Sequence, residues 1–105
     1  MSYYTTSVTK VSDVTPVKLV DINVATRPIK SMSLANIHAT DDVAVDVYLK
    51  NAAGTDYYII KGVVIPNATT LVLDEDLVNY NSNLYNLYIK LSAASSAVDV
   101  IIKNN

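Results

Sequence analysis

An alternation of apolar and polar side chains at a period of two is the feature that most constrains the fold of this chain. It is clearest over residues 43–50, where one set of side chains alternates with another: Val43, Val45, Val47 and Leu49 against Ala44, Asp46, Tyr48 and Lys50. Successive side chains of a β-strand point to opposite faces, so this pattern is typical of a strand with one buried and one solvated face. The segment therefore predicts a half-buried strand.

The residues that follow predict a hairpin and a further short strand. The loop Asn51-Ala-Ala-Gly-Thr-Asp is rich in small turn formers, and a second apolar run extends from Tyr57 to Ile65. We therefore expect an antiparallel pair. Pro66 lacks the N–H group that a strand ladder needs, so it ends the run, and alternation resumes over 69–73. The acidic stretch 74–84 is expected to hold one helical turn or an irregular connection.

Strands are also predicted near both ends of the chain. Alternation over 87–92 and 98–102, separated by Ala93-Ala-Ser-Ser-Ala, predicts a C-terminal hairpin. Upstream, Val20, Ile22 and Val24 alternate, and so do Met32 and Leu34. The pattern then shifts to Ala35 and Ile37, which predicts a β-bulge.

The spacing of these segments predicts the fold class. Strands recur about every ten to fourteen residues, and no stretch sustains the period of an amphipathic helix. Packing two sheets face to face would bury the apolar sides of the strands, so we expect an all-β protein, an antiparallel β-sandwich of about seven short strands, with a small β-barrel as the alternative. Residues 1–13 are expected to be an N-terminal arm or edge strand, and residues 14–105 a single β-sandwich domain.

Charge and composition exclude several classes of partner. Charged residues make up 17% of the chain, the net charge is −2, and there is no basic run that would neutralise phosphates, so we expect no nucleic acid partner. Every apolar stretch is interrupted well before the roughly 20 residues that span a bilayer, so no membrane partner is expected either. The first residues lack the features of a secretory signal, which predicts a soluble protein made in a cytoplasm.

Few residues offer reactive chemistry. His38 is the single histidine, it lies close to Asp41 and Asp42, and the chain has no cysteine to complete a transition-metal site. Asp74-Glu-Asp is acidic but lacks the ligand spacing of a calcium loop, and no glycine-rich loop is present to hold a nucleotide. We therefore predict no catalytic residue, no cofactor and no metal. A hydrolase that uses His38, Asp41 or Asp42 is the least favoured alternative.

Tyrosine is the only aromatic residue, and it occurs eight times. A tyrosine ring has an apolar body and a polar tip, which suits surfaces that become half buried against a partner. Tyr57, Tyr58, Tyr85 and Tyr88 are the candidate interface residues. The same rings also suit stacking on sugars, and a third interpretation is that they flank the core at strand ends.

Two segments resemble a known group of proteins. Val43 to Pro66, which contains Val-Tyr-Leu-Lys-Asn-Ala-Ala-Gly-Thr-Asp-Tyr-Tyr-Ile-Ile-Lys-Gly-Val-Val-Ile-Pro, continues into Asn-Ala-Thr-Thr-Leu-Val-Leu, and the second segment is Leu87-Tyr-Ile-Lys-Leu-Ser-Ala-Ala-Ser-Ser-Ala-Val-Asp-Val-Ile-Ile. Together they cover about two thirds of the chain. They resemble small virion structural proteins of tailed bacteriophages, including marine phages. No functional residues are carried over from that group.

The resemblance implies a β-domain of a virion, made in the cytoplasm of the host bacterium. Its expected partners are other virion structural proteins, and it is expected in many copies or as a homo-oligomer. The leading hypothesis is thus a non-enzymatic structural component of a phage particle, in head decoration, neck or tail. The alternative is a carbohydrate-binding or host-adhesion module.

Overall fold

The described residues form eight strands and one short helix. The computed structural model describes residues 5–21, 29–78, 80, 84–92 and 97–104. In chain order the elements are β1 (Thr5–Val11), β2 (Val17–Val20), β3 (Ile29–Asn36), β4 (Val43–Asn51), β5 (Asp56–Ile65), β6 (Thr70–Asp74), α1 (Glu75–Val78), β7 (Tyr85–Leu91) and β8 (Val98–Asn104). Of the predicted strand over 20–24, Val20 belongs to β2, and Ile22 and Val24 lie outside the described residues.

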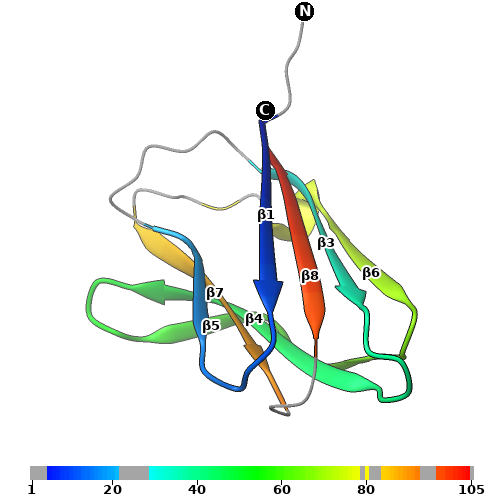
Figure 1. Ribbon diagram of the computed structural model, residues 1–105. Coiled ribbons are helices and arrows are strands. Elements are labelled where there is room, and N and C mark those ends of the chain that lie inside the picture. Colours follow the sequence, from blue (N-terminus) through cyan, green and yellow to red (C-terminus); the bar gives the residue numbers. More distant parts are fainter. Residues whose placement is uncertain (1–4, 22–28, 79, 81–83, 93–96, 105) are drawn as a thin grey trace, which may run out of the picture.

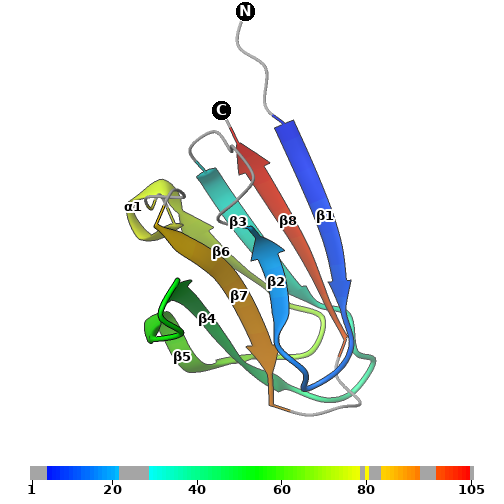
Figure 2. The same cartoon turned by 90° about the vertical axis from the view of Figure 1, so that its left-hand side faces the viewer.

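The strands form two antiparallel sheets that pack as a sandwich (Figures 1 and 2). One sheet has the order β1-β8-β3-β6 and the other β2-β7-β4-β5. Of the consecutive strand pairs, only β4 and β5 are neighbours in one sheet, and every other connection crosses between the sheets. This is the strand order of an eight-stranded jelly roll, an architecture built from two Greek keys. The predicted sandwich is confirmed, with eight strands in place of about seven and without closure into a barrel.

The core consists of the inward faces of both sheets. Alternate residues along β3, β4, β7 and β8 are fully buried, as the period of two requires. The large buried side chains are Met32, Leu34, Ile65, Leu87, Ile89 and Leu91. Full burial of such a side chain stabilises the fold by about 1.5–3 kcal/mol, so this layer supplies the main free energy that holds the sheets together.

The predicted hairpin between residues 43 and 65 is confirmed, since β4 and β5 are antiparallel neighbours. The predicted C-terminal hairpin is wrong: β7 pairs with β2 and β4, whereas β8 pairs with β1 and β3 in the other sheet. The connection after Leu91 therefore crosses between the sheets. Alternation shows that a segment is a strand, but it does not show which sheet the strand joins.

The bulge predicted after Leu34 is also wrong. Met32, Leu34 and Asn36 continue one regular inward face, and the register shift in β3 lies between Ile29 and Ser31. Asn36 is buried, and its amide Nδ2 donates to the carbonyl oxygens of Asp41 (3.0 Å) and Ile65 (2.9 Å). Its Oδ1 accepts the N–H of His38 at 3.0 Å. A polar residue thus occupies a core position because all its hydrogen-bonding groups have partners.

The acidic stretch begins with one helical turn. Asp74 Oδ1 accepts the N–H of Asp76 at 3.1 Å, which caps α1, and Val78 is buried in the core. Within the described residues, no helix has the length and apolar character needed to cross a membrane.

Candidate functional site: a tyrosine row on one sheet face

A row of aromatic side chains crosses the outer face of the β2-β7-β4-β5 sheet. Tyr48 of β4 lies directly opposite Tyr88 of β7 on one side and Tyr58 of β5 on the other. Lys18 of β2 is the cross-strand partner of Tyr88 and extends the row to the edge of the sheet. Residues that face each other across strands have Cβ atoms about 5 Å apart, so the register itself brings these side chains together. We call Tyr48, Tyr58 and Tyr88 the tyrosine row.

The rings of the tyrosine row are in contact with one another. The centroids of Tyr48 and Tyr88 are 5.5 Å apart with an interplanar angle of 8°, which is a stacked arrangement. The centroids of Tyr48 and Tyr58 are 5.2 Å apart at 46°. Pairs of this kind add about 0.5–1.5 kcal/mol beyond the burial of area. The row therefore stiffens the outer face of the sheet.

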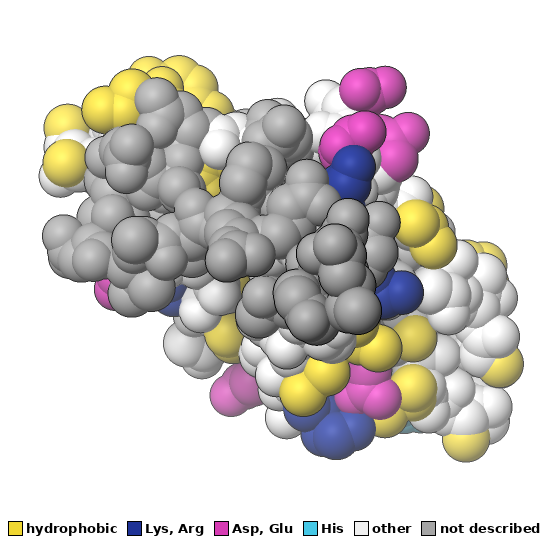
Figure 3. Space-filling view, turned by 90° about the horizontal axis from the view of Figure 1, so that it is seen from above, with side chains coloured by type: hydrophobic (Ala, Val, Ile, Leu, Met, Phe, Trp, Pro, Cys, Tyr) yellow, Lys and Arg dark blue, Asp and Glu magenta, His cyan; other side chains and the backbone are white. Residues whose placement is uncertain are grey.

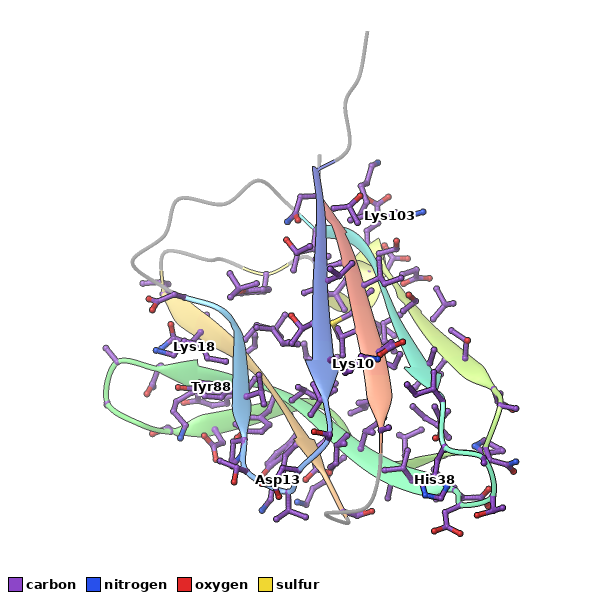
Figure 4. All side chains as sticks on the ribbon, viewed as in Figure 1. Lys10, Asp13, Lys18, His38, Tyr88 and Lys103 are labelled. Atoms are coloured by element: carbon purple, nitrogen blue, oxygen red, sulfur yellow. The ribbon has the colours of Figure 1, made fainter. Side chains whose placement is uncertain are left out.

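Three lysines cover the exposed parts of this row. The Lys61 ammonium lies 4.3 Å from the centroid of Tyr58, and those of Lys50 and Lys18 lie 5.2 and 5.9 Å from that of Tyr88. Figure 4 shows Lys18 and Tyr88 close together on this sheet.

Carboxylates hold these lysines in place. Lys50 Nζ lies 3.6 Å from Asp56 Oδ1, Lys61 Nζ 3.9 Å from Asp46 Oδ2, and Lys18 Nζ 3.5 Å from Asp21 Oδ2. Three ion pairs between lysine and aspartate side chains thus lie over the rings of the tyrosine row.

Tyr48 is the buried centre of the row, with 4% of its surface exposed. Burial raises the pKa of its phenol above the usual value of 10.0, and the negative charge of Asp56 raises it further. The ring therefore stays neutral in neutral solution. Its burial between two aromatic neighbours is that of a packing residue.

The four predicted interface residues fall into two groups. Tyr58 and Tyr88 belong to the tyrosine row, whereas Tyr57 and Tyr85 lie on the opposite face of the same sheet, as the alternation along β5 and β7 requires. Tyr57 and Tyr85 meet edge to face, with centroids 6.1 Å apart at 82°. Tyr57 is 51% exposed, although this face forms the core elsewhere in the sheet. An aromatic pair with one exposed ring, Tyr57, and one half-buried ring, Tyr85, is thus present near the end of the β4–β5 hairpin.

His38 has a structural position in a turn. Its Nδ1 accepts the backbone N–H groups of Thr40 (3.1 Å) and Asp41 (3.0 Å), so the remaining proton of the neutral ring lies on Nε2. Asp42 is also engaged, since its Oδ1 accepts the N–H of Asn67 at 3.1 Å. Figure 4 places His38 at the opposite side of the molecule from Lys18 and Tyr88. The imidazole and the carboxylates therefore fix the turn between β3 and β4.

The charged groups do not converge on a metal site. Among the described residues, no three His, Cys, Asp or Glu side chains are grouped so that they could hold a metal ion. Seen from above, several acidic side chains gather at the upper right with a basic side chain beside them, and further charged side chains lie lower in the view (Figure 3).

A shallow groove of about 570 Å³ adjoins the tyrosine row. It is lined on the sheet by Ala44, Asp46, Gly62 and Lys90, and on the other side by Val14, Thr15 and Pro16 of the β1–β2 loop. Asp46 and Lys90 are cross-strand partners, one step along the same face from Tyr48 and Tyr88. Polar groups able to hydrogen-bond a ligand therefore lie beside aromatic rings.

The lysines of this site were missed by sequence reasoning, which selected only tyrosines. For Lys50 a signal was present, because it lies two residues after Tyr48 on the same face of one strand. For Lys18 and Lys61 the signal was absent, because their positions depend on strand pairing and on the bulges of β5.

Fold and site together define a jelly-roll β-sandwich with an aromatic outer face. No protein-family model matches the chain, and no curated protein matches it. Among solved structures it is similar to the crystal structure of the Yersinia pseudotuberculosis-derived mitogen, with 13% sequence identity, a TM-score of 0.45, and coverage of 99% of this chain and 86% of that chain.

Proposed function

We propose that this chain is a non-enzymatic structural component of a tailed bacteriophage particle, which docks on neighbouring virion subunits through exposed aromatic and apolar side chains. The observation that carries the proposal is the exposed ring of Tyr57, which packs edge to face against the half-buried ring of Tyr85. Tyrosine is enriched at protein interfaces because its rigid ring buries a large area at a low entropic cost. Leu84, next to Tyr85 in the chain, is exposed as well and enlarges the apolar surface.

The structural roles of the reactive groups also support a protein without catalysis. The imidazole of His38 and the carboxylates of Asp42 and Asp74 all accept backbone N–H groups in turns or at a helix start. The groups that a hydrolase would need are therefore used to fix loops.

The resemblance of residues 43–73 and 87–102 to virion structural proteins supports the same function. These segments contain β4 and β5 and most of β6, β7 and β8, so the resemblance extends over both sheets. Jelly rolls are used by viral capsid domains and by lectins, which favours both candidate functions on grounds of architecture alone.

Incorporation into particles tests the proposal. Tyr57→Ser should reduce the amount of this chain in purified virions at least fivefold, because it removes the exposed ring of the docking pair. Leu77→Ser is the matched control, since Leu77 is 50% exposed on α1 and away from this pair. Equal loss for both variants, or no loss for either, would count against docking through Tyr57.

A carbohydrate-binding or host-adhesion module is the second candidate, and the groove beside the tyrosine row favours it. Asp46 and Lys90 would bind sugar hydroxyls while a ring of the row stacks on the sugar face. For such stacking the lysine over a ring has to move aside. A glycan array probes this directly: binding that Tyr58→Ala abolishes and Tyr57→Ala preserves would support the module, and an array without any binder would end it.

A further inference from the structure

β1 is an edge strand of its sheet. Of the four edge strands in the two sheets, it has the fewest features that prevent pairing with a further strand. It pairs with β8 over all seven residues with no register shift, and no other described strand lies beyond it (Figure 2). Its sequence, Thr-Thr-Ser-Val-Thr-Lys-Val, is rich in β-branched residues and has no proline and no acidic residue. An unpaired edge of this kind is a template for a further strand.

The other three edge strands are protected against pairing. β2 has only four residues and a register shift against β7. β5 has two register shifts, and Gly62 adopts a positive φ of 66° there. β6 has five residues and leads directly into α1. Short edges and bulges are the usual means by which proteins block edge-to-edge association, so the regularity of β1 distinguishes it from the rest.

The single charge on β1 does not protect it. Lys10 Nζ lies 2.7 Å from Asp99 Oδ1 of β8, so the ammonium is held over the sheet and neutralised within the chain. Lysines on edge strands usually oppose pairing with a further strand, and this effect is weaker here because the charge of Lys10 is already paired within the chain.

We propose that β1 pairs antiparallel with β1 of a second copy of this chain, about a two-fold axis that passes beside Val8. Antiparallel pairing of all seven residues with their copies requires that Val8 face Val8 of the second copy. Thr6 then faces Lys10 of the other copy. Two four-stranded sheets become one continuous eight-stranded sheet.

Charge and apolar surface fit this occupant. The two Lys10 side chains lie four residues apart along the joined strands, about 13 Å, and each faces a threonine, so no like charges oppose each other. Val8 is 73% exposed in the isolated chain and gains an apolar partner on the axis. A strand pair alone buries less than the roughly 1,200 Å² typical of stable complexes, so we expect a dimer with a dissociation constant in the micromolar range.

Sedimentation of matched lysine variants tests the surface. Val8→Lys should weaken the dimer at least tenfold, because it places two ammonium groups together on the axis. Val72→Lys is the control on the opposite edge strand of the same outer face, where Val72 is 62% exposed, and it should change the dissociation constant less than twofold. Equal weakening by both variants would show face-to-face packing and overturn the proposal. A chain that stays monomeric at millimolar concentration would also overturn the proposal. The partner of the β1 edge would then be a strand of a different protein.

Single cysteines test the register, since the chain has no cysteine of its own. Directly opposed residues of antiparallel strands have Cα atoms about 4.5–5.5 Å apart, within the range of a disulfide. Val8→Cys should therefore form a disulfide-linked dimer under mild oxidation, and Thr6→Cys should not. Linkage of Thr6→Cys in preference to Val8→Cys would overturn the proposed axis. Both tests use the isolated chain, so their outcome is independent of whether the chain is a virion protein.

Discussion

Tyr48 lies flat against Tyr88, with ring centroids 5.5 Å apart and ring planes inclined by 8°. The contact joins the two central strands of one sheet on the side away from the core. Since Tyr48 is almost fully buried there, the outer face of this sheet carries a second, small aromatic layer that contributes to stability.

Removal of the central ring should therefore be costly. Tyr48→Ala is expected to lower the free energy of unfolding by about 2–4 kcal/mol, because it deletes a buried ring and both of its aromatic contacts. Urea denaturation measures the change. Tyr58→Ala, at the half-exposed end of the row, is the control and should cost about 1 kcal/mol or less. Equal costs would contradict the central role of Tyr48.

The buried amide of Asn36 should contribute nearly as much as Tyr48 to the free energy of unfolding. Asn36→Ala leaves the carbonyl of Ile65 and the N–H of His38 without their partner, with an expected cost of about 2–3 kcal/mol. Asn67→Ala removes an exposed amide that donates to Ala39 O at 3.3 Å, and it should cost less than about 1 kcal/mol. Thermal unfolding of both variants provides the comparison.

Alkaline pH should destabilise the fold through Tyr80. Burial raises the pKa of this phenol from 10.0 to about 12, and within the described part of the chain its hydroxyl has no hydrogen-bond partner. Near pH 10 the phenol loses its proton in the unfolded state, while the folded state retains it. The contribution of Tyr80 to the free energy of unfolding is therefore fully present below pH 10 and is lost as the pH rises towards 12.

Tyr80→Phe isolates this contribution. It should reduce the loss of stability between pH 10 and 12 and leave stability at pH 7 unchanged or slightly higher, because no hydrogen bond to a described residue is broken. Denaturation midpoints measured at pH 7, 10 and 11.5 test both statements. An unchanged alkaline slope in the variant would show that other groups cause the loss.

The bulge in β5 depends on a glycine. Gly62 has a φ of 66°, and a Cβ atom added there would meet no other atom within 4 Å. Gly62→Ala should therefore cost about 1–2 kcal/mol through backbone conformation alone. Gly62→Asn should cost less, since asparagine tolerates this conformation better. The order of the two melting temperatures is the readout, and an asparagine variant less stable than the alanine variant would argue for a steric cause.

The sequence predicted where the strands lie better than it predicted which strands pair with one another. The alternation of Val43, Val45 and Val47 identified β4 because side chains on one face share one environment. Asn36 has the opposite effect: a polar residue at an inward position of β3 resembles a shift of face in the sequence, although its amide makes its hydrogen bonds in the core. The sheet to which β7 and β8 belong depends on contacts far apart in sequence, so neither the cross-over after Leu91 nor the position of Lys18 beside Tyr88 was accessible from local pattern.

Quantitative mass spectrometry of phage particles purified from a lysate that contains this chain is the most direct test of the proposed function. The proposal predicts that the chain remains with the particles after density-gradient purification and a high-salt wash, in multiple copies at a fixed ratio to the major capsid protein. Absence of the chain from purified particles, with the free protein found in the lysate, would contradict a structural role in the virion.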